Sequence, residues 1–138
     1  MKKILIAFAS TTGNTESMAS AIKKGAEGAG NQVEFVNLAE STPSIDGYDV
    51  IVLGSPAMGC EVLEESYMEP FFTSIEGSIS GKNVALFGSY DWGEGEWLSN
   101  WEDRVKTAGA NLVCESLKIN LTPDAAGEGL CENFGKNL

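Results

Sequence analysis

The sequence predicts an α/β fold in which helices cover both faces of an open parallel sheet. Short apolar runs alternate with segments of helical period along the whole chain, which is the pattern of successive β-α-β units. Most of these runs are unbroken, as in strands that are buried on both faces. The chain has 138 residues, of which 43% are hydrophobic. This length predicts one domain, residues 1–138, that is large enough to bury a core.

The first part of the chain is predicted to form a buried strand, a helix and a second strand. Residues 3–9 (KILIAFA) are a continuous apolar run. Residues 14–28 place Met, Ala and Ile at helical spacing, and Gly28 and Gly30 end this helix. Residues 32–37 (QVEFVN) alternate apolar and polar side chains, which predicts a strand nearer the edge of the sheet.

The rest of the chain repeats the pattern of apolar strand and periodic helix. Gly109 ends one of the helices, and Pro123 opens the last one, where its missing N–H costs nothing. The predicted ranges are 49–53 and 82–89 for two buried strands, 67–75 and 97–108 for two helices, 111–121 for one or two strand pieces, and 123–136 for the last helix.

Charge and histidine content exclude several classes of protein. Nine basic and twenty acidic residues leave a net charge of −11, and the chain has no His. Catalysis by a Ser-His or Cys-His pair and zinc held by His are therefore excluded. The negative charge argues against nucleic acid and anionic membranes as partners and favours basic-faced proteins.

Cysteine spacing and the N-terminal segment predict a cytoplasmic protein. Cys60, Cys114 and Cys131 form no C-x-x-C motif, so neither a zinc knuckle nor a dithiol site is indicated. Free thiols suit a reducing compartment, and Cys114 and Cys131 are interpreted as core fillers. Lys2 and Lys3 precede an apolar run that is too short for a signal peptide or a membrane span.

A neutral, hydroxyl-rich loop lies between the first strand and the first helix. Backbone N–H groups at a helix start, together with hydroxyl donors, bind anions. The loop has no Lys or Arg and does not match G-x-x-x-x-G-K-[ST], so the ligand it suits is one phosphate monoester. The alternative is a plain Ser or Thr helix cap. The residues of this candidate phosphate site are Ser10, Thr11, Thr12, Gly13, Asn14 and Thr15.

Two further loops follow predicted strands and carry large apolar side chains among Gly, Glu and Ser. Met58 and Trp92 each stand just past a strand end. A thioether and an indole in these positions could hold a flat aromatic ring between them. The alternative for either side chain is a place in the core.

These motifs together resemble one family. Ser10, Thr12, Gly13 and Thr15 match the pattern [ST]-x-[ST]-G-x-T of the flavodoxin phosphate loop. The stretches GSPAMG, EVLEES and ALFGSY, the last followed by Trp92-Gly93, resemble the other cofactor loops of short-chain, clostridial-type flavodoxins. The resemblance implies a flavodoxin-like three-layer sandwich, with a five-stranded parallel sheet of order 2-1-3-4-5, and non-covalently bound FMN.

The resemblance also assigns roles in a ring site. It places Met58 and Trp92 on the two faces of the flavin ring and Glu61 at the flavin N3–H, with Tyr90 as an alternative ring neighbour. It allows Ser55 a phosphate contact and places Ser89 on the ribityl–phosphate side. The residues of this second set are Ser55, Pro56, Ala57, Met58, Gly59, Cys60, Glu61, Ser89, Tyr90, Asp91, Trp92 and Gly93.

The function that the resemblance implies is low-potential electron transfer. The protein would carry one electron at a time between the semiquinone and hydroquinone states of FMN, as a monomer with no substrate of its own. Cys60 stands where the family usually has Asp, Asn or Gly. Asp91 stands where the family commonly has Gly. We expect Cys60 to weaken the semiquinone, because the turn there favours Gly. We expect Asp91 to lower the second potential by charge repulsion, with smaller, screened contributions from other loop acids such as Glu64.

Three other readings compete with an electron carrier. A receiver-type signalling domain needs acidic residues at two strand ends, where Ala9-Ser10 and Gly54-Ser55 stand instead. An FMN-dependent reductase of the same fold needs a substrate pocket or further domains. A flavoprotein that serves one dedicated partner is harder to separate, although the Met-Gly and Trp-rich loops favour the general carrier.

Overall fold

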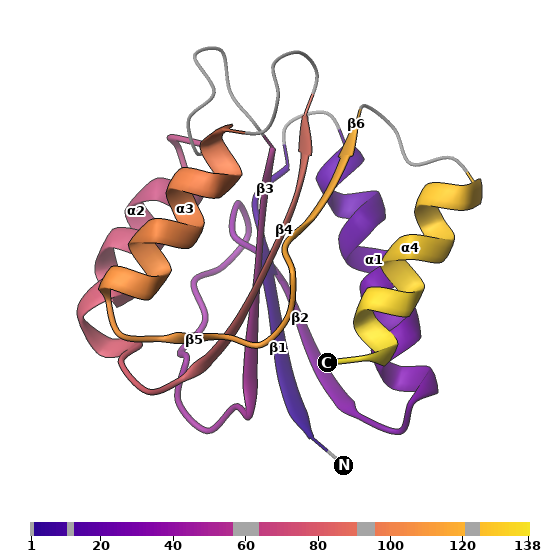
Figure 1. Ribbon diagram of the computed structural model, residues 1–138, viewed down its shortest axis with the longest axis horizontal. Coiled ribbons are helices and arrows are strands. Elements are labelled where there is room, and N and C mark those ends of the chain that lie inside the picture. The colour runs from indigo at the N-terminus through magenta and orange to yellow at the C-terminus, as the bar shows by residue number, and fades with distance from the viewer. Residues whose placement is uncertain (1, 11–12, 57–63, 91–95, 121–124) are drawn as a thin grey trace.

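The computed structural model has one parallel sheet between two pairs of helices (Figure 1). It describes residues 2–10, 13–56, 64–90, 96–120 and 125–138. The strand order is β2-β1-β3-β4, and both β5 and β6 pair with β4 on its far side. The strands are β1 Lys3–Phe8, β2 Gln32–Asn37, β3 Val50–Pro56, β4 Asn83–Tyr90, β5 Asn111–Leu112 and β6 Leu117–Asn120.

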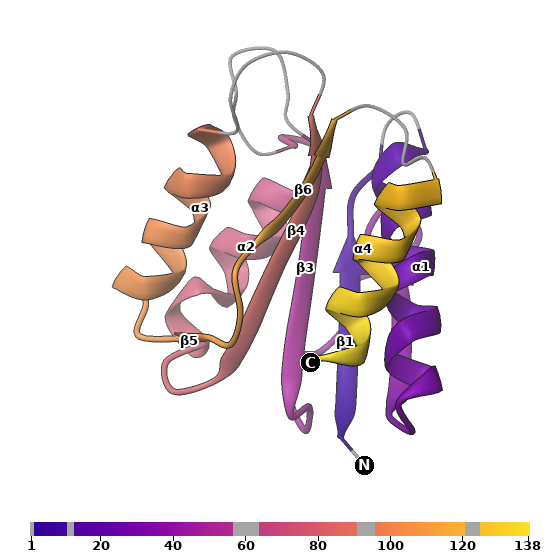
Figure 2. The same ribbon diagram turned by 45° about the vertical axis from the view of Figure 1, so that its right-hand side comes forward.

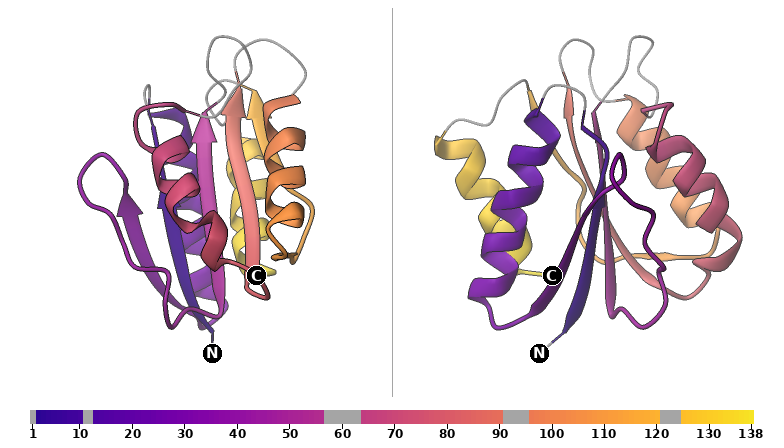
Figure 3. Two further views of the ribbon diagram at one scale, coloured as in Figure 1. Left: turned by 90° about the vertical axis from the view of Figure 1, so that its left-hand side faces the viewer. Right: turned by 180° about the vertical axis from the view of Figure 1, so that it is seen from behind.

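The helices form the two outer layers. The α1 and α4 helices lie on one face of the sheet, and α2 and α3 lie on the other (Figures 2 and 3). Their bounds are α1 Asn14–Gly28, α2 Met68–Ile75, α3 Glu96–Thr107 and α4 Ala125–Lys136, with a short 3-10 turn, η1, at Glu76–Ser78. The predicted three-layer sandwich and the strand order are thereby confirmed.

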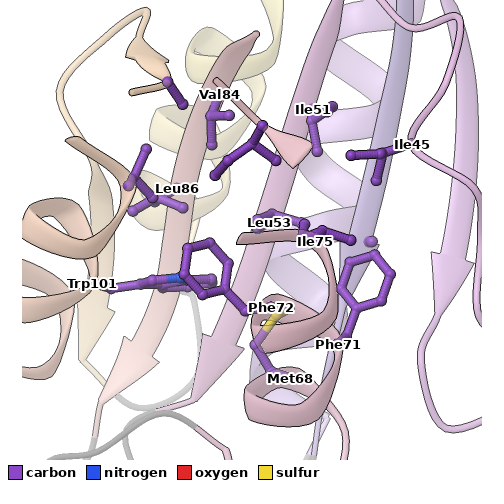
Figure 4. Close-up of a cluster of buried hydrophobic side chains, with 14 of the residues drawn as sticks. Ile45, Ile51, Leu53, Met68, Phe71, Phe72, Ile75, Val84, Leu86 and Trp101 are labelled. Atoms are coloured by element: carbon purple, nitrogen blue, oxygen red, sulfur yellow. The ribbon is translucent and has the colours of Figure 1, made fainter. Parts of the chain in front are cut away.

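Each face of the sheet has its own hydrophobic core, because neighbouring residues of a strand point to opposite faces. In β1, Leu5 and Ala7 face α2 and α3, whereas Ile4, Ile6 and Phe8 face α1 and α4. All five side chains are completely buried, which explains the unbroken apolar run in the sequence. Figure 4 shows the core on the α2 and α3 face, where the side chains of β3 and β4 meet those of the two helices.

The last strand position of the sheet is occupied by two short strands that both pair with β4. From Val84 to Phe87 is three residues along β4, whereas from Leu112 to Leu117 is five along the chain that pairs with it. Two extra residues therefore interrupt the ladder, and the strand divides into β5 and β6. Residues 111–121 were predicted to form one or two strand pieces, and two are observed.

The other predicted elements are found close to their predicted ranges. The α1 helix and β2 have the bounds that were predicted. The predicted strand 49–53 instead runs from Val50 to Pro56, because Gly54, Ser55 and Pro56 continue the ladder with Phe87, Gly88 and Ser89. Ser55 and Pro56 of the candidate site therefore belong to the sheet, as do Ser89 and Tyr90 at the end of β4.

The α1 and α4 helices approach each other closely at two glycines. A Cβ at Gly25 would lie 1.9 Å from the carbonyl oxygen of Glu132, and one at Gly135 would lie 2.0 Å from that of Ile22. A side chain at either position would force the helices apart. The close packing holds α1 against α4, and the first turn of α1 belongs to the candidate site.

Candidate functional site

The candidate residues that the structure describes lie at the carboxyl ends of three neighbouring strands. Ser10 follows β1, Ser55 and Pro56 end β3, and Ser89 and Tyr90 end β4. Because β1, β3 and β4 are adjacent and parallel, their carboxyl ends lie side by side at one end of the sheet (Figure 1). In open α/β sheets, ligands bind beyond these carboxyl ends.

Gly13 begins α1 with a backbone conformation that suits glycine. Its φ is +91°, and no heavy atom that the structure describes lies within 4 Å of the place a Cβ would take. The Ser10 hydroxyl accepts hydrogen bonds from the backbone N–H of Gly13 at 3.1 Å and of Glu16 at 3.4 Å. Ser10 therefore caps the first turn as an acceptor, and the space beside Gly13 is open.

A buried hydroxyl pair connects the helix with the sheet. The Thr15 and Ser89 hydroxyl oxygens are 2.7 Å apart, and the two residues are 1% and 4% exposed. The bond joins the first turn of α1 to the end of β4 across 74 residues of sequence. The structure thus brings together a residue from the predicted phosphate loop and a residue from the predicted ring set.

Ser55 makes its hydrogen bonds within the chain. Its hydroxyl donates to the carbonyl of Pro56 at 2.9 Å and accepts from the backbone N–H of Glu64 at 3.0 Å. Ser55 is completely buried. Its hydroxyl therefore connects two positions of the main chain, a contact that the sequence did not indicate.

Glu64 is the main residue near the site whose role was wrongly predicted. The sequence predicts a screened acid of the loops, but Glu64 is only 2% exposed. Its carboxylate accepts hydrogen bonds from the backbone N–H groups of Ser66 and Tyr67, both at 2.7 Å, and of Met68 at 3.1 Å. Glu64 therefore caps the start of α2. An acid three residues before the predicted helix start was the signal available in the sequence.

Trp97 supports the end of β4 from the core. A Cβ at Gly88 would lie 1.9 Å from the Trp97 ring and 2.3 Å from the carbonyl oxygen of Ser55. The ring centroids of Trp97 and Trp101 are 6.3 Å apart, and both residues are 1% exposed. The prediction that these two tryptophans pack the helix is confirmed. Gly88 was not recognised as the residue that lets Trp97 lie against the sheet.

Tyr90 lies at the edge of the site and is partly buried. The Lys118 ammonium of β6 lies over its ring, 5.9 Å from the centroid. This contact places a basic side chain beside the end of β4. Lys118 thus brings a positive charge to the site, although the net charge of the chain is −11.

The two cysteines that the structure describes lack the character of redox groups. Burial raises the pKa of the Cys114 thiol, and burial together with nearby Glu128 and Glu132 raises that of Cys131 to about 11. A thiol with a raised pKa is mostly protonated at neutral pH and is a poor nucleophile. The interpretation of Cys131 as a core filler is confirmed, whereas Cys114 is only half-buried.

Ten candidate residues lie outside the described part of the chain. They are Thr11, Thr12, Ala57, Met58, Gly59, Cys60, Glu61, Asp91, Trp92 and Gly93. Within the described ranges, no group of three or more His, Cys, Asp or Glu residues could hold a metal ion. No helix in those ranges is long and apolar enough to cross a membrane.

Comparison with known proteins decides the family. The model of the family described as flavodoxin matches residues 6–135. The flavodoxin of Megasphaera elsdenii is 43% identical over 132 residues, covering 95% of this chain and 94% of that protein. The flavodoxin of Clostridium beijerinckii is 43% identical over 134 residues, covering 96% of each. This chain belongs to the flavodoxin family.

Solved flavodoxin structures have the same fold as this chain. The solution structure of two-electron reduced Megasphaera elsdenii flavodoxin has a TM-score of 0.85 at 42% identity, and covers 97% of this chain and 96% of that one. Oxidised flavodoxin 1 from Bacillus cereus has a TM-score of 0.87 at 30% identity, covering 98% and 95%. The chain is therefore a small FMN-binding electron-transfer protein, as the resemblance implied.

The described residues fit the phosphate end of FMN. Ser10, Gly13, Thr15 and Ser89 supply hydroxyl groups and an open backbone at a helix start, with no carboxylate among them. A helix N-terminus attracts an anion through its N–H groups and its dipole. FMN, when bound, supplies the redox chemistry, and the protein supplies the position and the electrostatic surroundings.

Proposed function

We propose that this flavodoxin is a low-potential carrier that moves one electron at a time and has no substrate of its own. The observation that supports this role is the meeting of three strand ends and the start of α1 around buried hydroxyls, joined by the 2.7 Å contact between Thr15 and Ser89. We assign the FMN phosphate to Ser10, Thr11, Thr12, Gly13, Asn14 and Thr15, with Ser89 beside it. We assign the flavin ring to residues 56–61 and 90–93, with Met58 and Trp92 on its two faces.

The net charge supports a proposal about partners. A chain with a charge of −11 attracts basic faces of reductases and electron acceptors, and repels nucleic acid and anionic membranes. We expect a monomer in the cytoplasm. Electron transfer to a basic partner should then slow down as salt is raised from about 0.05 to 0.5 M, because screening shortens the range of the attraction.

A reductive titration followed by visible spectra tests the carrier function. We expect the purified protein to be yellow and to take up two electrons in two separate one-electron steps. A single two-electron step would favour enzyme chemistry and refute the carrier proposal. A colourless protein that takes up no added FMN would refute the cofactor assignment as well.

Comparison of FMN with riboflavin tests the phosphate assignment, because riboflavin lacks the phosphate. Thr15→Ala should weaken FMN binding about tenfold, the effect of losing one hydrogen bond to a charged group, and leave riboflavin binding nearly unchanged. Ser20→Ala is the matched control, since Ser20 lies on the same helix and is exposed. An equal loss for both ligands in Thr15→Ala would contradict the assignment.

A further inference from the structure

Ser55 and Glu64 form a connection between the two chain positions that flank residues 57–63. Ser55 lies near the end of β3, and Glu64 is nine residues further along, just before α2. The hydrogen bond from the Glu64 backbone N–H to the Ser55 hydroxyl is 3.0 Å long. Both residues are buried, so water does not compete for this bond.

Each side of this connection is held by further hydrogen bonds. The Ser55 hydroxyl also donates to the carbonyl of Pro56, which orients its lone pair towards Glu64. The Glu64 carboxylate accepts from three backbone N–H groups at the start of α2, and its own carbonyl accepts from the N–H of Glu69 at 2.9 Å. Glu64 therefore fastens the start of α2 and presents its N–H to Ser55.

The connection is built on rigid parts of the fold. Ser55 pairs with Gly88 in the ladder between β3 and β4. The backbone N–H of Met68 donates a hydrogen bond to the Glu64 carboxylate, and the Met68 side chain is completely buried in the core that α2 forms with the sheet. The separation of the two flanking positions is thus set by the sheet on one side and by a packed helix on the other.

We propose that Ser55 and Glu64 are a positioning pair that sets how tightly the flavin ring is held. This inference rests on the proposed function, in which residues 57–61 belong to the ring site. Neither residue needs to contact the flavin. The proposal gives Ser55 a role through Glu64 in place of the phosphate contact that the sequence suggested.

Variants of Ser55 and Glu64 test the pair through flavin binding by the apoprotein. Ser55→Ala leaves the buried Glu64 N–H without its acceptor, and Glu64→Gln replaces one acceptor oxygen with an amide that faces N–H groups. Glu65→Gln is the matched control, because it removes the same charge from the exposed neighbouring position. Dissociation constants for FMN and riboflavin are measured by quenching of flavin fluorescence, at a temperature where each variant is fully folded.

We expect Ser55→Ala and Glu64→Gln to weaken FMN and riboflavin binding by the same factor, about tenfold, and to alter the visible band shape of the bound flavin. Glu65→Gln should leave both unchanged. Ser55→Cys keeps the size of the side chain with a poorer acceptor, so it should give an intermediate loss, and it serves if Ser55→Ala does not fold.

Three results would overturn the pair. Unchanged affinity and band shape in folded Ser55→Ala, with only a lower melting temperature, would show a purely structural role. Weaker binding of FMN alone would show that Ser55 acts at the phosphate. Equal effects in Glu65→Gln and Glu64→Gln would show that charge, and not position, matters. Failure of the unsubstituted chain to bind FMN would instead refute the proposed function itself.

Discussion

Replacement of Gly25 by Ala should separate α1 from α4. The new Cβ would lie 1.9 Å from the carbonyl oxygen of Glu132, 2.7 Å from its carbon and 2.9 Å from its Cα. These are backbone atoms of a helix, so no side chain can rotate out of the way. Ordinary contact needs roughly 3.5 Å, so the two helices would have to move apart by roughly 1.5 Å.

The magnitude follows from two opposing effects. Alanine favours a helix over glycine by about 1 kcal/mol. Overpacking a tight contact costs about 1–3 kcal/mol, and a clash with three backbone atoms belongs at the upper end of that range. We therefore expect Gly25→Ala to lower the free energy of unfolding by about 2 kcal/mol, which is a fall of roughly 8 °C in the melting temperature for a domain of this size.

Gly28→Ala is the matched control for this prediction. Gly28 is on the same helix and has no heavy atom within 4 Å of the place its Cβ would take, among the residues that the structure describes. It should therefore be neutral or more stable by up to about 0.5 kcal/mol. Both variants are compared by urea unfolding of the apoprotein. A Gly25→Ala protein as stable as Gly28→Ala would refute the close approach of the helices.

The remaining predictions concern the site and one ion-pair cluster. Gly88→Ala should displace the Trp97 ring and weaken FMN binding at least about tenfold, whereas Gly77→Ala, which meets no described atom within 4 Å, should leave binding unchanged. Loss of binding in both, or in neither, would contradict this packing. The hydrogen bond from Arg104 lowers the pKa of the Glu69 carboxyl. The ion pair of Glu69 with Arg104 should therefore stabilise the folded protein fully above about pH 4.3, the pKa of a Glu carboxyl in the unfolded chain. This stabilisation should be lost as the pH falls through the lower pKa of Glu69 in the folded protein. Because the Glu69 and Arg104 side chains are 41% and 31% exposed, Glu69→Gln should cost only about 1 kcal/mol at pH 7, and the difference should vanish near pH 2 in urea unfolding curves. A constant difference across that pH range would refute the electrostatic contribution.

Much of the fold could be predicted from local patterns alone. The unbroken run in β1 corresponds to side chains that are buried on both faces, and the alternating run in β2 corresponds to a strand at the edge of the sheet. The positions of Gly30 and Gly109, with φ of +91° and +87°, agree with the predicted helix ends. The sequence allowed one or two strand pieces over residues 111–121, and the choice depends on how many residues β4 offers between its two partners.

The phosphate loop was predictable because its residues are neighbours in the chain. A strand, a run of hydroxyls and a helix start are local features, and together they predict an anion site at the carboxyl ends of the strands. Gly13 and Thr15 of this loop lie at the start of α1, and the Ser10 hydroxyl accepts hydrogen bonds from its first turn. The roles of those residues towards FMN stay predictions.

Only the tertiary structure showed what joins the start of α1 to the end of β4. Thr15 and Ser89 are 74 residues apart in sequence and share a hydrogen bond, and no local pattern predicts such a pair. The sequence predicted Glu64 to be an exposed acid in an acidic segment. The structure buries it, because three backbone N–H groups at the start of α2 donate hydrogen bonds to its carboxylate. By itself the sequence determined the class of fold, the position of the ligand edge and the family pattern, because these depend on periodicity and on contiguous residues. The structure decided which distant side chains support that edge, because such contacts depend on the register of the strands and on how closely the helices pack against them.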